Sequence, residues 1–371
     1  MLAYGRRVLV GSLLVTASWA GWGVVSTQAM AAGRGGESTA SVAAHAYLRR
    51  ALTLIEQRDI FAERVRWAVE WRSLSRRFER SPTIGTADSL IEQALSDIGD
   101  RHGYIVTKTA QRPGPSSSLT IPYGRVLAGE IGYLSLPATT AQPGSANAVR
   151  YASRGEALVR SLYRRGAKGW VVDLRLNGGG DIFPMLLAIG GLLDGDRVLG
   201  FRDRSGSTTW IGYRDSALYV GDKRVMAAPV AEPEIPANAR VALLVGPETV
   251  SSGEAVVVAL HGRPDTRTFG LATAGEAVAV SRYPLAGRRV LEMSSAYDVD
   301  RFERAYIGPI PPDTVMWPAR SDVDQTLTAA VAWTNPSRGN RDSVVWTSIS
   351  LVVLVACAHI AQRLGGRKSD D

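Results

Sequence analysis

The sequence predicts a mixed α/β fold, because short apolar strand patterns alternate with helical patterns along much of the chain. In chain order, strand patterns at 132–136, 170–175 and 241–245 are followed by helical patterns at 148–164, 183–193 and 255–261. Glycine and small polar residues break the chain after the second and third strands, as is typical of turns between a strand and a helix. This alternation favours a sheet whose strands are connected through helices.

A helical region is expected ahead of this core. From Ser41 to Phe78 apolar residues recur at spacings of three and four, and the pattern returns from Leu90 to Ile98. Trp67 and Trp71 lie in this region and are interpreted as packing residues. We therefore expect a flexible linker over 32–40, a helical cap subdomain over 41–101, and a core over 102–335 that opens with a short strand at 104–107.

The N-terminus has the pattern of a secretory signal. Arg6 and Arg7 precede an uncharged stretch that reaches Val25, and the small residues Ala29 and Ala31 fit a signal-peptidase site. We predict a signal peptide over residues 1–31. An uncleaved anchor is the alternative, since the apolar stretch is also long enough to span a membrane.

The C-terminus has a second uncharged stretch, 344–361, which is followed by Arg363, Arg367 and Lys368. Its length and the positive charges after it predict a transmembrane helix with a cytoplasmic tail over 362–371, joined to the core by a linker over 336–343. The alternative is a buried terminal helix. This topology places the catalytic domain outside the cytoplasm, at the cell membrane.

Composition narrows the classes of function. The net charge is +8, but the arginines are dispersed and do not alternate with aromatic residues, so we expect no nucleic-acid partner. The single cysteine, Cys357, lies in the predicted transmembrane helix, which leaves disulfides no part in stability. Because the chain has neither a metal-ligand cluster nor the Lys-Ser/Thr of a phosphate-binding loop, we expect no cofactor.

The stretch Thr249-Val250-Ser251-Ser252-Gly253-Glu254 forms a small-residue turn between a strand and a helix. Such a turn exposes a hydroxyl in the position of a nucleophile, which needs a base to act at neutral pH. Of the four histidines, His45 lies near the linker, His359 lies in the membrane stretch, and His261 ends the following helix. Only His102, in a break between a helix and a strand, is well placed to be the base.

Gly178, Gly179 and Gly180 follow another strand and precede a helix. Their unobstructed backbone N–H groups favour an anion site, although glycines in such a turn can also serve tight packing alone.

Taken together, these segments resemble the tail-specific, or C-terminal processing, serine peptidases. The motifs that carry the resemblance are Asp100-Arg101-His102-Gly103, Gly132-Tyr133-Leu134, Asp173-Leu174-Arg175-Leu176-Asn177-Gly178-Gly179-Gly180, Thr249 to Glu254, and Gly270-Leu271-Ala272-Thr273-Ala274-Gly275. The resemblance implies a core related to the ClpP/crotonase superfamily, built of β-β-α units. It also implies that Ser251, and not Ser252, is the nucleophile. The oxyanion hole would combine the Ser252 N–H with that of Gly178 or Gly179.

The chain departs from many members of this family in two ways. Where they have a lysine after the Thr-x-Gly turn, this chain has Glu276, so it is similar to the serine/histidine branch, which includes lantibiotic-resistance peptidases. There is also too little sequence between His102 and Gly132 for a PDZ domain. The group that orients His102 stays open among Glu254, Glu276 and Asp313.

The sequence therefore predicts a membrane-anchored, extracytoplasmic serine peptidase that acts on peptide or protein substrates through an acyl-enzyme. Two alternatives remain at this point. One is an inactive ligand- or peptide-binding module on the same core, and the other is an esterase with the same nucleophile.

Overall fold

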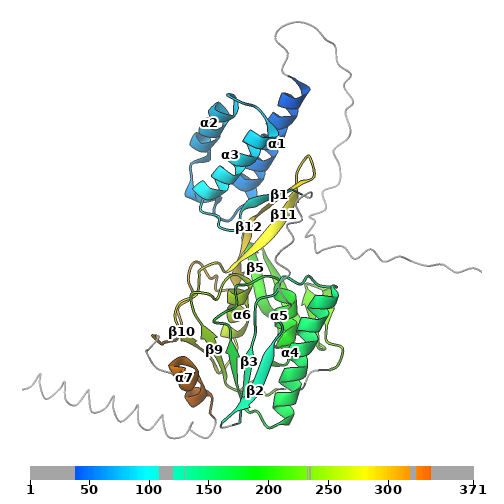
Figure 1. Ribbon diagram of the computed structural model, residues 1–371, viewed down its shortest axis with the longest axis vertical. Coiled ribbons are helices and arrows are strands. Elements are labelled where there is room, and N and C mark those ends of the chain that lie inside the picture. The colour runs from blue at the N-terminus through cyan, green and yellow to red at the C-terminus, as the bar shows by residue number, and fades with distance from the viewer. Residues whose placement is uncertain are drawn as a thin grey trace, which may run out of the picture.

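The computed structural model describes residues 38–107, 120–128, 130–231, 233, 235–317 and 323–335. These residues form an elongated body in which helices α1, α2 and α3 lie at one end and a mixed α/β core lies at the other (Figure 1). Strands β1, β11 and β12 lie between the two ends. The fold class predicted from the sequence, a mixed α/β chain, is confirmed.

The N-terminal helices are α1 (Thr39–Arg58), α2 (Trp67–Phe78) and α3 (Ile84–Asp97). Ser38 and Thr83 cap α1 and α3 by accepting the backbone N–H of the residue three positions later. Apolar faces of all three helices form one cluster with Leu291 and Met293, which belong to a strand far along the chain. The indole of Trp67 is buried in this unit and donates to Ala62 O at 2.8 Å, as expected of a packing residue.

The first sheet is antiparallel and was largely missed by the sequence patterns. Its strands run in the order β1 (Tyr104–Thr107), β12 (Arg289–Val299), β5 (Gly195–Asp203), β6 (Thr208–Arg214), β7 (Ala217–Val220) and β8 (Lys223–Ala227), with β11 (Val278–Pro284) also paired to β12. Several of these strands carry charged or exposed residues at successive positions, which weakens the alternation that marks a strand.

The second sheet carries the predicted strands. Its order is β13 (Thr314–Val315), β10 (Thr266–Gly270), β9 (Val241–Val245), β4 (Gly169–Asp173), β3 (Ile131–Ser135) and β2 (Tyr123–Leu127). All neighbours pair in parallel except β2 and β3. Because parallel strands end at the same edge, the turns that follow β4 and β9 lie side by side. Their register pairs Asp173 with Leu244.

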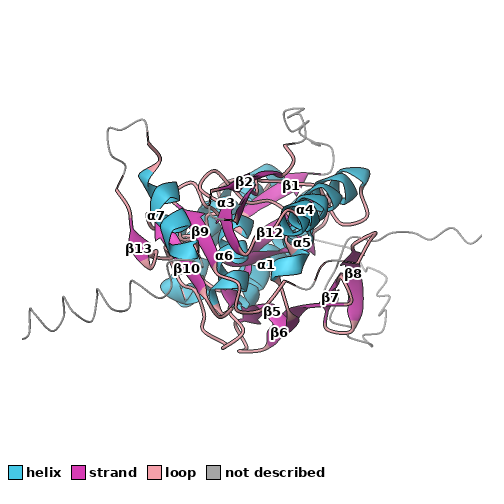
Figure 2. Cartoon of the chain, turned by 90° about the horizontal axis from the view of Figure 1, so that it is seen from below, coloured by secondary structure: helices cyan, strands magenta, loops and turns pink. Residues whose placement is uncertain are grey.

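Helices cover both faces of the second sheet (Figure 2). Helix α7 (Gln325–Thr334) packs on one face, against β4, β9 and β10. Helices α4 (Ala146–Arg164), α5 (Ile182–Ala188) and α6 (Ser252–His261) lie on the other face, where α5 and α6 also contact strands of the first sheet. Two predicted boundaries were wrong: α6 begins at Ser252 instead of residue 255, and the helix expected to reach 193 ends at Ala188 before a 3-10 turn over Gly190–Leu192.

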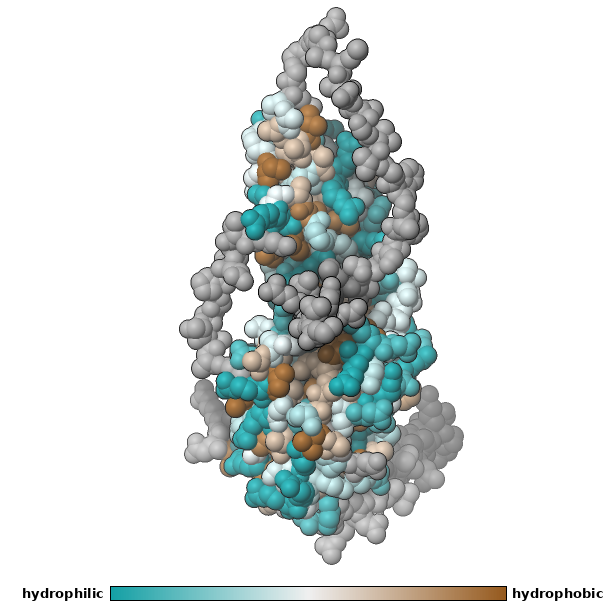
Figure 3. Space-filling model, turned by 90° about the vertical axis from the view of Figure 1, so that its right-hand side faces the viewer, coloured by the Kyte–Doolittle hydropathy of each residue, from teal (hydrophilic) through white to brown (hydrophobic). Residues whose placement is uncertain are grey.

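No helix in the described ranges combines the length and the apolar character that a membrane crossing requires. The predicted signal peptide (1–31) and transmembrane helix (344–361) lie outside the described residues. On the face shown in Figure 3, apolar side chains of the described residues form scattered patches between hydrophilic ones.

Candidate active site

The turn that carries Ser251, the predicted nucleophile, connects β9 to α6 at the carboxyl edge of the parallel sheet. Thr249 accepts the Gly246 N–H at 3.0 Å and donates its hydroxyl to Leu174 O at 2.9 Å, so the turn is tied to the end of β4. Ser251 is the N-cap of α6 and has φ 52° and ψ −118°. A positive φ is strained for a residue with a side chain, and such strain is concentrated at functional sites.

Glu254 holds this turn together from inside the protein. Its side chain has no exposed surface, yet its carboxylate accepts four hydrogen bonds: from Ser251 N at 3.0 Å, Thr273 Oγ1 at 2.5 Å, Gly275 N at 2.8 Å and Glu276 N at 2.7 Å. A carboxylate satisfied in this way is stable when buried. Glu254 therefore fixes the backbone of Ser251 against the Thr273–Glu276 turn and is not available to orient a histidine.

A second buried acid lies near Glu254. Asp298, on β12, donates its backbone N–H to Ala277 O at 3.1 Å. Burial raises the pKa of Asp298 well above its usual value, and the charge of Glu254 adds to the effect. These effects favour the neutral form of Asp298.

His102 lies in the loop between α3 and β1, where its Nδ1 is 3.3 Å from Glu276 Oε2. The other oxygen of Glu276 is 2.5 Å from Arg101 Nη1. Side-chain exposure is 22% for His102, 9% for Glu276 and 72% for Arg101, so the carboxylate is nearly buried and the arginine lies at the surface. The Nδ1 to Oε2 contact is looser than an aligned hydrogen bond, as is common for catalytic groups without substrate.

These contacts link the two predicted catalytic residues through one turn. Ser251 donates to Glu254, Glu254 accepts the N–H of Glu276, and the side chain of Glu276 reaches His102. Residues 102 and 251, which are far apart in sequence, are thus connected through two intervening glutamates.

Asp313, the third candidate to orient His102, lies elsewhere. It accepts the N–H and hydroxyl of Thr268 at 2.8 and 2.9 Å and lies 3.9 Å from His261 Nε2. His261 Nδ1 is 3.0 Å from the hydroxyl of Tyr306. The hypothesis that Asp313 orients His102 is therefore wrong. The expectation that His261, at the end of α6, takes no part in the site agrees with these contacts.

The glycine turn, residues 178–180, abuts the predicted nucleophile, Ser251. A Cβ on Gly179 would lie 2.8 Å from Val250 O and 3.0 Å from Ser251 Cβ, and Gly179 has φ +90°. Only glycine fits this position. The adjacent Gly178 faces open space, because a Cβ there would meet no atom within 4 Å.

Asn177 decides which glycine can donate to an oxyanion. Its buried side chain donates to Leu136 O at 2.9 Å and accepts the Gly179 N–H at 2.9 Å, so the N–H of Gly179 is already used. Within the described residues, the N–H groups of Gly178 and Ser252 have no hydrogen-bond acceptor. Of the two glycines that were predicted, only Gly178 is free to donate. The role of Asn177 was missed, and only its position before the glycines hinted at it.

Ser252 contributes in two ways. Its hydroxyl donates to Gly180 O at 2.7 Å, which joins the start of α6 to the glycine turn. Its backbone N–H is at the N-terminus of a helix, where the dipole favours negative charge.

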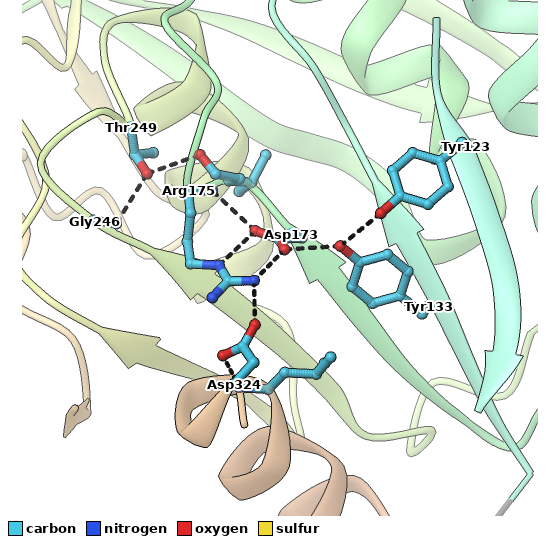
Figure 4. A network of polar contacts seen from close by, with 9 residues as sticks. Tyr123, Tyr133, Asp173, Arg175, Gly246, Thr249 and Asp324 are labelled. Atoms are coloured by element: carbon cyan, nitrogen blue, oxygen red, sulfur yellow. Dashed lines mark hydrogen bonds and ion pairs between the residues drawn. The ribbon is translucent and has the colours of Figure 1, made fainter. Parts of the chain in front are cut away.

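A polar network fixes the strand end that leads into the glycine turn (Figure 4). Asp173 accepts two hydrogen bonds from the Arg175 guanidinium, at 3.0 and 2.6 Å, and one from Tyr133 at 2.8 Å. Arg175 also pairs with Asp324, the N-cap of α7, at 2.8 Å. Partial burial acts to raise the pKa of Asp324, but the hydrogen bond and charge of Arg175 and the backbone N–H groups at the start of α7 together outweigh it, so the pKa is lowered. The network anchors α7 to the segment that precedes Gly178.

The described residues contain no group of three or more His, Cys, Asp or Glu side chains that could hold a metal ion. The arrangement instead offers a hydroxyl on a strained turn, an imidazole with a carboxylate behind it, and two unpaired backbone N–H groups. These are the parts that acyl transfer through a serine requires.

Comparisons with known proteins agree with this geometry. The sequence profile of peptidase family S41 matches residues 130–316, half of the chain. The nisin-resistance protein of Lactococcus lactis subsp. lactis is 24% identical over 268 residues, which cover 72% of this chain and 81% of that protein. A lipoprotein from Streptococcus agalactiae has the same fold, with a TM-score of 0.64 and 21% identity over 79% of this chain and 96% of that one. The photosystem II D1 C-terminal processing protease has a TM-score of 0.51 and 12% identity over 76% and 94% of the two chains.

Proposed function

Because this chain belongs to peptidase family S41, we propose that it is a serine peptidase in which Ser251 is the nucleophile and His102 is the general base. The observation that carries the proposal is the contact path from Ser251 through Glu254 and Glu276 to His102. A serine hydroxyl needs such a base at neutral pH, since little of it is ionised otherwise.

In the proposed reaction, Ser251 Oγ attacks the carbonyl carbon of the scissile peptide bond while His102 Nε2 takes the hydroxyl proton. The tetrahedral intermediate then expels the amine, to which His102 returns the proton, and an acyl-enzyme on Ser251 remains. Water, activated by the same histidine, hydrolyses this ester and restores the serine.

Glu276 is proposed to hold His102 in the productive tautomer. A carboxylate at Nδ1 keeps the proton on that nitrogen, leaves Nε2 free to accept, and stabilises the imidazolium that forms during the reaction. The 3.3 Å contact and the nearly complete burial of Glu276 support this role.

The oxyanion is proposed to be bound by the N–H groups of Gly178 and Ser252. Both are unpaired within the described part of the chain, and the Ser252 hydroxyl keeps the two segments together through Gly180 O. Donors fixed in advance stabilise the developing charge without having to reorganise, and each is worth about 100- to 1,000-fold in rate.

We further propose that the peptidase works outside the cytoplasm, held at the membrane by residues 344–361 after removal of residues 1–31. The charge and hydropathy patterns at the two ends support this topology. In this arrangement helices α1 to α3 act as a cap, because the loop after α3 supplies His102. The substrates are peptides or proteins, and the relative that confers nisin resistance makes nisin the first peptide to test.

The test combines covalent labelling with turnover. The full chain in detergent is treated with a fluorophosphonate, the labelled residue is mapped by mass spectrometry, and hydrolysis of nisin, an unmodified peptide library and a small ester is followed. We expect the label on Ser251 and peptide turnover that Ser251→Ala removes. Label on another residue would overturn the assignment, and turnover of the ester without any peptide would make the protein an esterase.

A further inference from the structure

Two buried carboxyl groups lie next to each other where the helical unit joins the first sheet. Asp59 ends α1 and has no exposed surface, and Asp100, in the loop after α3, is 5% exposed. Neither side chain has an ion pair with a basic group in the described residues. Two adjacent buried acids without a cation require an explanation, because ionising both carboxyl groups in a buried site costs much free energy.

Asp100 controls the loop that carries His102. Its Oδ1 accepts the backbone N–H of His102 at 3.0 Å, which forms an Asx turn, and the hydroxyl of Ser294 at 2.7 Å. Its Oδ2 accepts the Ser294 N–H at 2.9 Å. Ser294 is itself tied to the end of α1, since its carbonyl accepts the Ile60 N–H at 3.1 Å. Asp100 thus fixes the histidine loop to both β12 and α1.

Asp59 is satisfied on one side only. Its Oδ1 accepts the Phe61 N–H at 2.8 Å, whereas its Oδ2 is buried with no donor among the described residues. A proton on Asp59, donated to the neighbouring Asp100, would satisfy both acids at once. Burial and then the charge of Asp100 raise the pKa of Asp59 to about 8, so the proton is present at neutral pH.

The other charged and titratable groups around the pair do not remove this conflict. Arg64 lowers the pKa of Asp59 only slightly against the larger effects, and its guanidinium donates to the carbonyl oxygen of residue 98 at 3.1 Å. Tyr283 and Tyr297 also face Asp59, and burial raises the pKa of both phenols, which keeps them neutral.

We propose that Asp59 is a positioning residue for the peptidase: a proton shared between Asp59 and Asp100 locks the loop that presents His102 to Ser251. The inference rests on the proposed function of His102. Release of this proton to solvent at alkaline pH leaves two buried like charges, which separate and loosen the Asx turn at His102. The helical unit would then hold the base in place only while Asp59 is protonated.

The sign of the pH dependence follows from linkage. The pKa of Asp59 in the folded protein, about 8, is above the ordinary value of 3.8. Its contribution to stability is therefore complete below the ordinary value and is lost as the pH rises through 8. Peptidase activity should therefore fall at alkaline pH as Asp59 ionises.

The experiment compares the full chain with Asp59→Asn, which keeps a neutral hydrogen-bond donor next to Asp100 but cannot ionise. Asp97→Asn, an exposed acid on the same helical unit, is the matched control. We expect kcat/KM of the wild type and of Asp97→Asn to fall about tenfold between pH 7 and pH 9, and that of Asp59→Asn to change less than about twofold. An alkaline fall that is unchanged in Asp59→Asn would overturn the proposal.

A second measurement separates this proposal from the proposed function. The ring signals of His102, assigned with His102→Gln, are followed by NMR between pH 6 and pH 10. A second inflection near pH 8 that disappears in Asp59→Asn supports the lock even if no peptide is cleaved. If the His102 signals show no inflection that depends on Asp59, the lock does not exist, whatever the activity. If the wild type cleaves no peptide but shows the inflection, the proposed peptidase function is wrong and the lock is still supported.

Discussion

The proposed nucleophile and the proposed base come from halves of the molecule that are built differently. Ser251 stands at the carboxyl edge of the parallel sheet. Its turn is fixed by Glu254, whose partners Thr273, Gly275 and Glu276 follow 19 to 22 residues later in the sequence. His102 stands at the junction of a helical unit and an antiparallel sheet, and its loop is fixed by Asp100 bound to Ser294, 194 residues away.

This difference predicts which changes should affect each half most. The nucleophile half depends on backbone conformation and on a carboxylate with four hydrogen-bond donors. Single substitutions there should therefore lower the rate of the chemical step. The histidine half depends on side-chain contacts between the helical unit and the antiparallel sheet, which are far apart in sequence. The position of His102 should therefore respond to pH and to the packing of α1. The following predictions test that contrast, from the largest expected effect to the smallest.

Ser251→Ala should lower kcat/KM for a peptide by at least about 1,000-fold, because it removes the covalent route. Ser252→Ala keeps its backbone N–H and loses only the hydroxyl bond to Gly180 O, so we expect a loss of less than about tenfold. Thermal unfolding of both variants checks that they are folded. Reversed effects would make Ser252 the nucleophile, and no effect from either would exclude a serine peptidase.

Glu276→Gln should lower kcat by about 100- to 10,000-fold with little change in KM, because the amide no longer holds His102 in the productive tautomer. Arg101→Gln is the control. It removes the exposed partner of the same carboxylate, and an exposed ion pair contributes little, so we expect a change of less than about threefold. Equal losses in both variants would mean that Glu276 acts through Arg101 and not on the histidine.

Asn177→Ala should lower the free energy of unfolding by about 1–3 kcal/mol, because it leaves the N–H of Gly179 and the carbonyl of Leu136 without partners inside the protein. The same change frees the glycine turn and should lower kcat. Asn238→Ala, at an exposed position, should change stability by less than about 0.5 kcal/mol. Urea unfolding measures both, and equal stability of the two variants would contradict the role given to Asn177.

Asp181→Asn should show the smallest effect. Asp181 caps α5 by accepting the Phe183 N–H at 3.0 Å, and burial raises its pKa to about 6. Because its pKa is raised in the folded state, Asp181 contributes fully to stability at pH values below 3.8, its ordinary pKa. This contribution is lost as the pH rises through 6. Asparagine caps equally well and does not titrate, so the variant should lie close to the wild type near pH 4 and exceed its stability at pH 7. Urea unfolding at the two pH values measures this, and a difference that does not depend on pH would contradict it.

The sequence predicted most of the nucleophile half. The run Val241–Val245, the serine turn and the glycine turn are local patterns whose chemistry can be named without knowing the fold, and the match to family S41 confirms the resemblance drawn from them. His102 was selected by elimination among the histidines and by the resemblance of the segment 100–103 to the family motif. Its surroundings depend on Asp100, Ser294 and Glu276, which come together through sheet pairing that no local pattern encodes.

The same reason explains what was missed. The antiparallel sheet joins strands separated by up to nearly two hundred residues, such as β1 and β12, and its exposed, charged strands lack a clear alternation. Asp59 has an ordinary position at the end of a helix, and nothing in its sequence neighbours indicates that Asp100 lies beside it. Glu276 was among three candidates for the acid behind His102, and only the fold separated them.

The backbone of Ser251, with φ 52° and ψ −118°, also has a consequence for how this protein can change. Glycine adopts that conformation without strain, so Ser251→Gly should relieve about 1 kcal/mol while removing the proposed nucleophile. Any search for more stable variants that ignores turnover would therefore be drawn toward inactive ones at this position. Thermal stability and turnover therefore make opposite demands on the φ and ψ angles of residue 251. In a library selected for heat resistance alone, we expect glycine to replace the proposed nucleophile at this position.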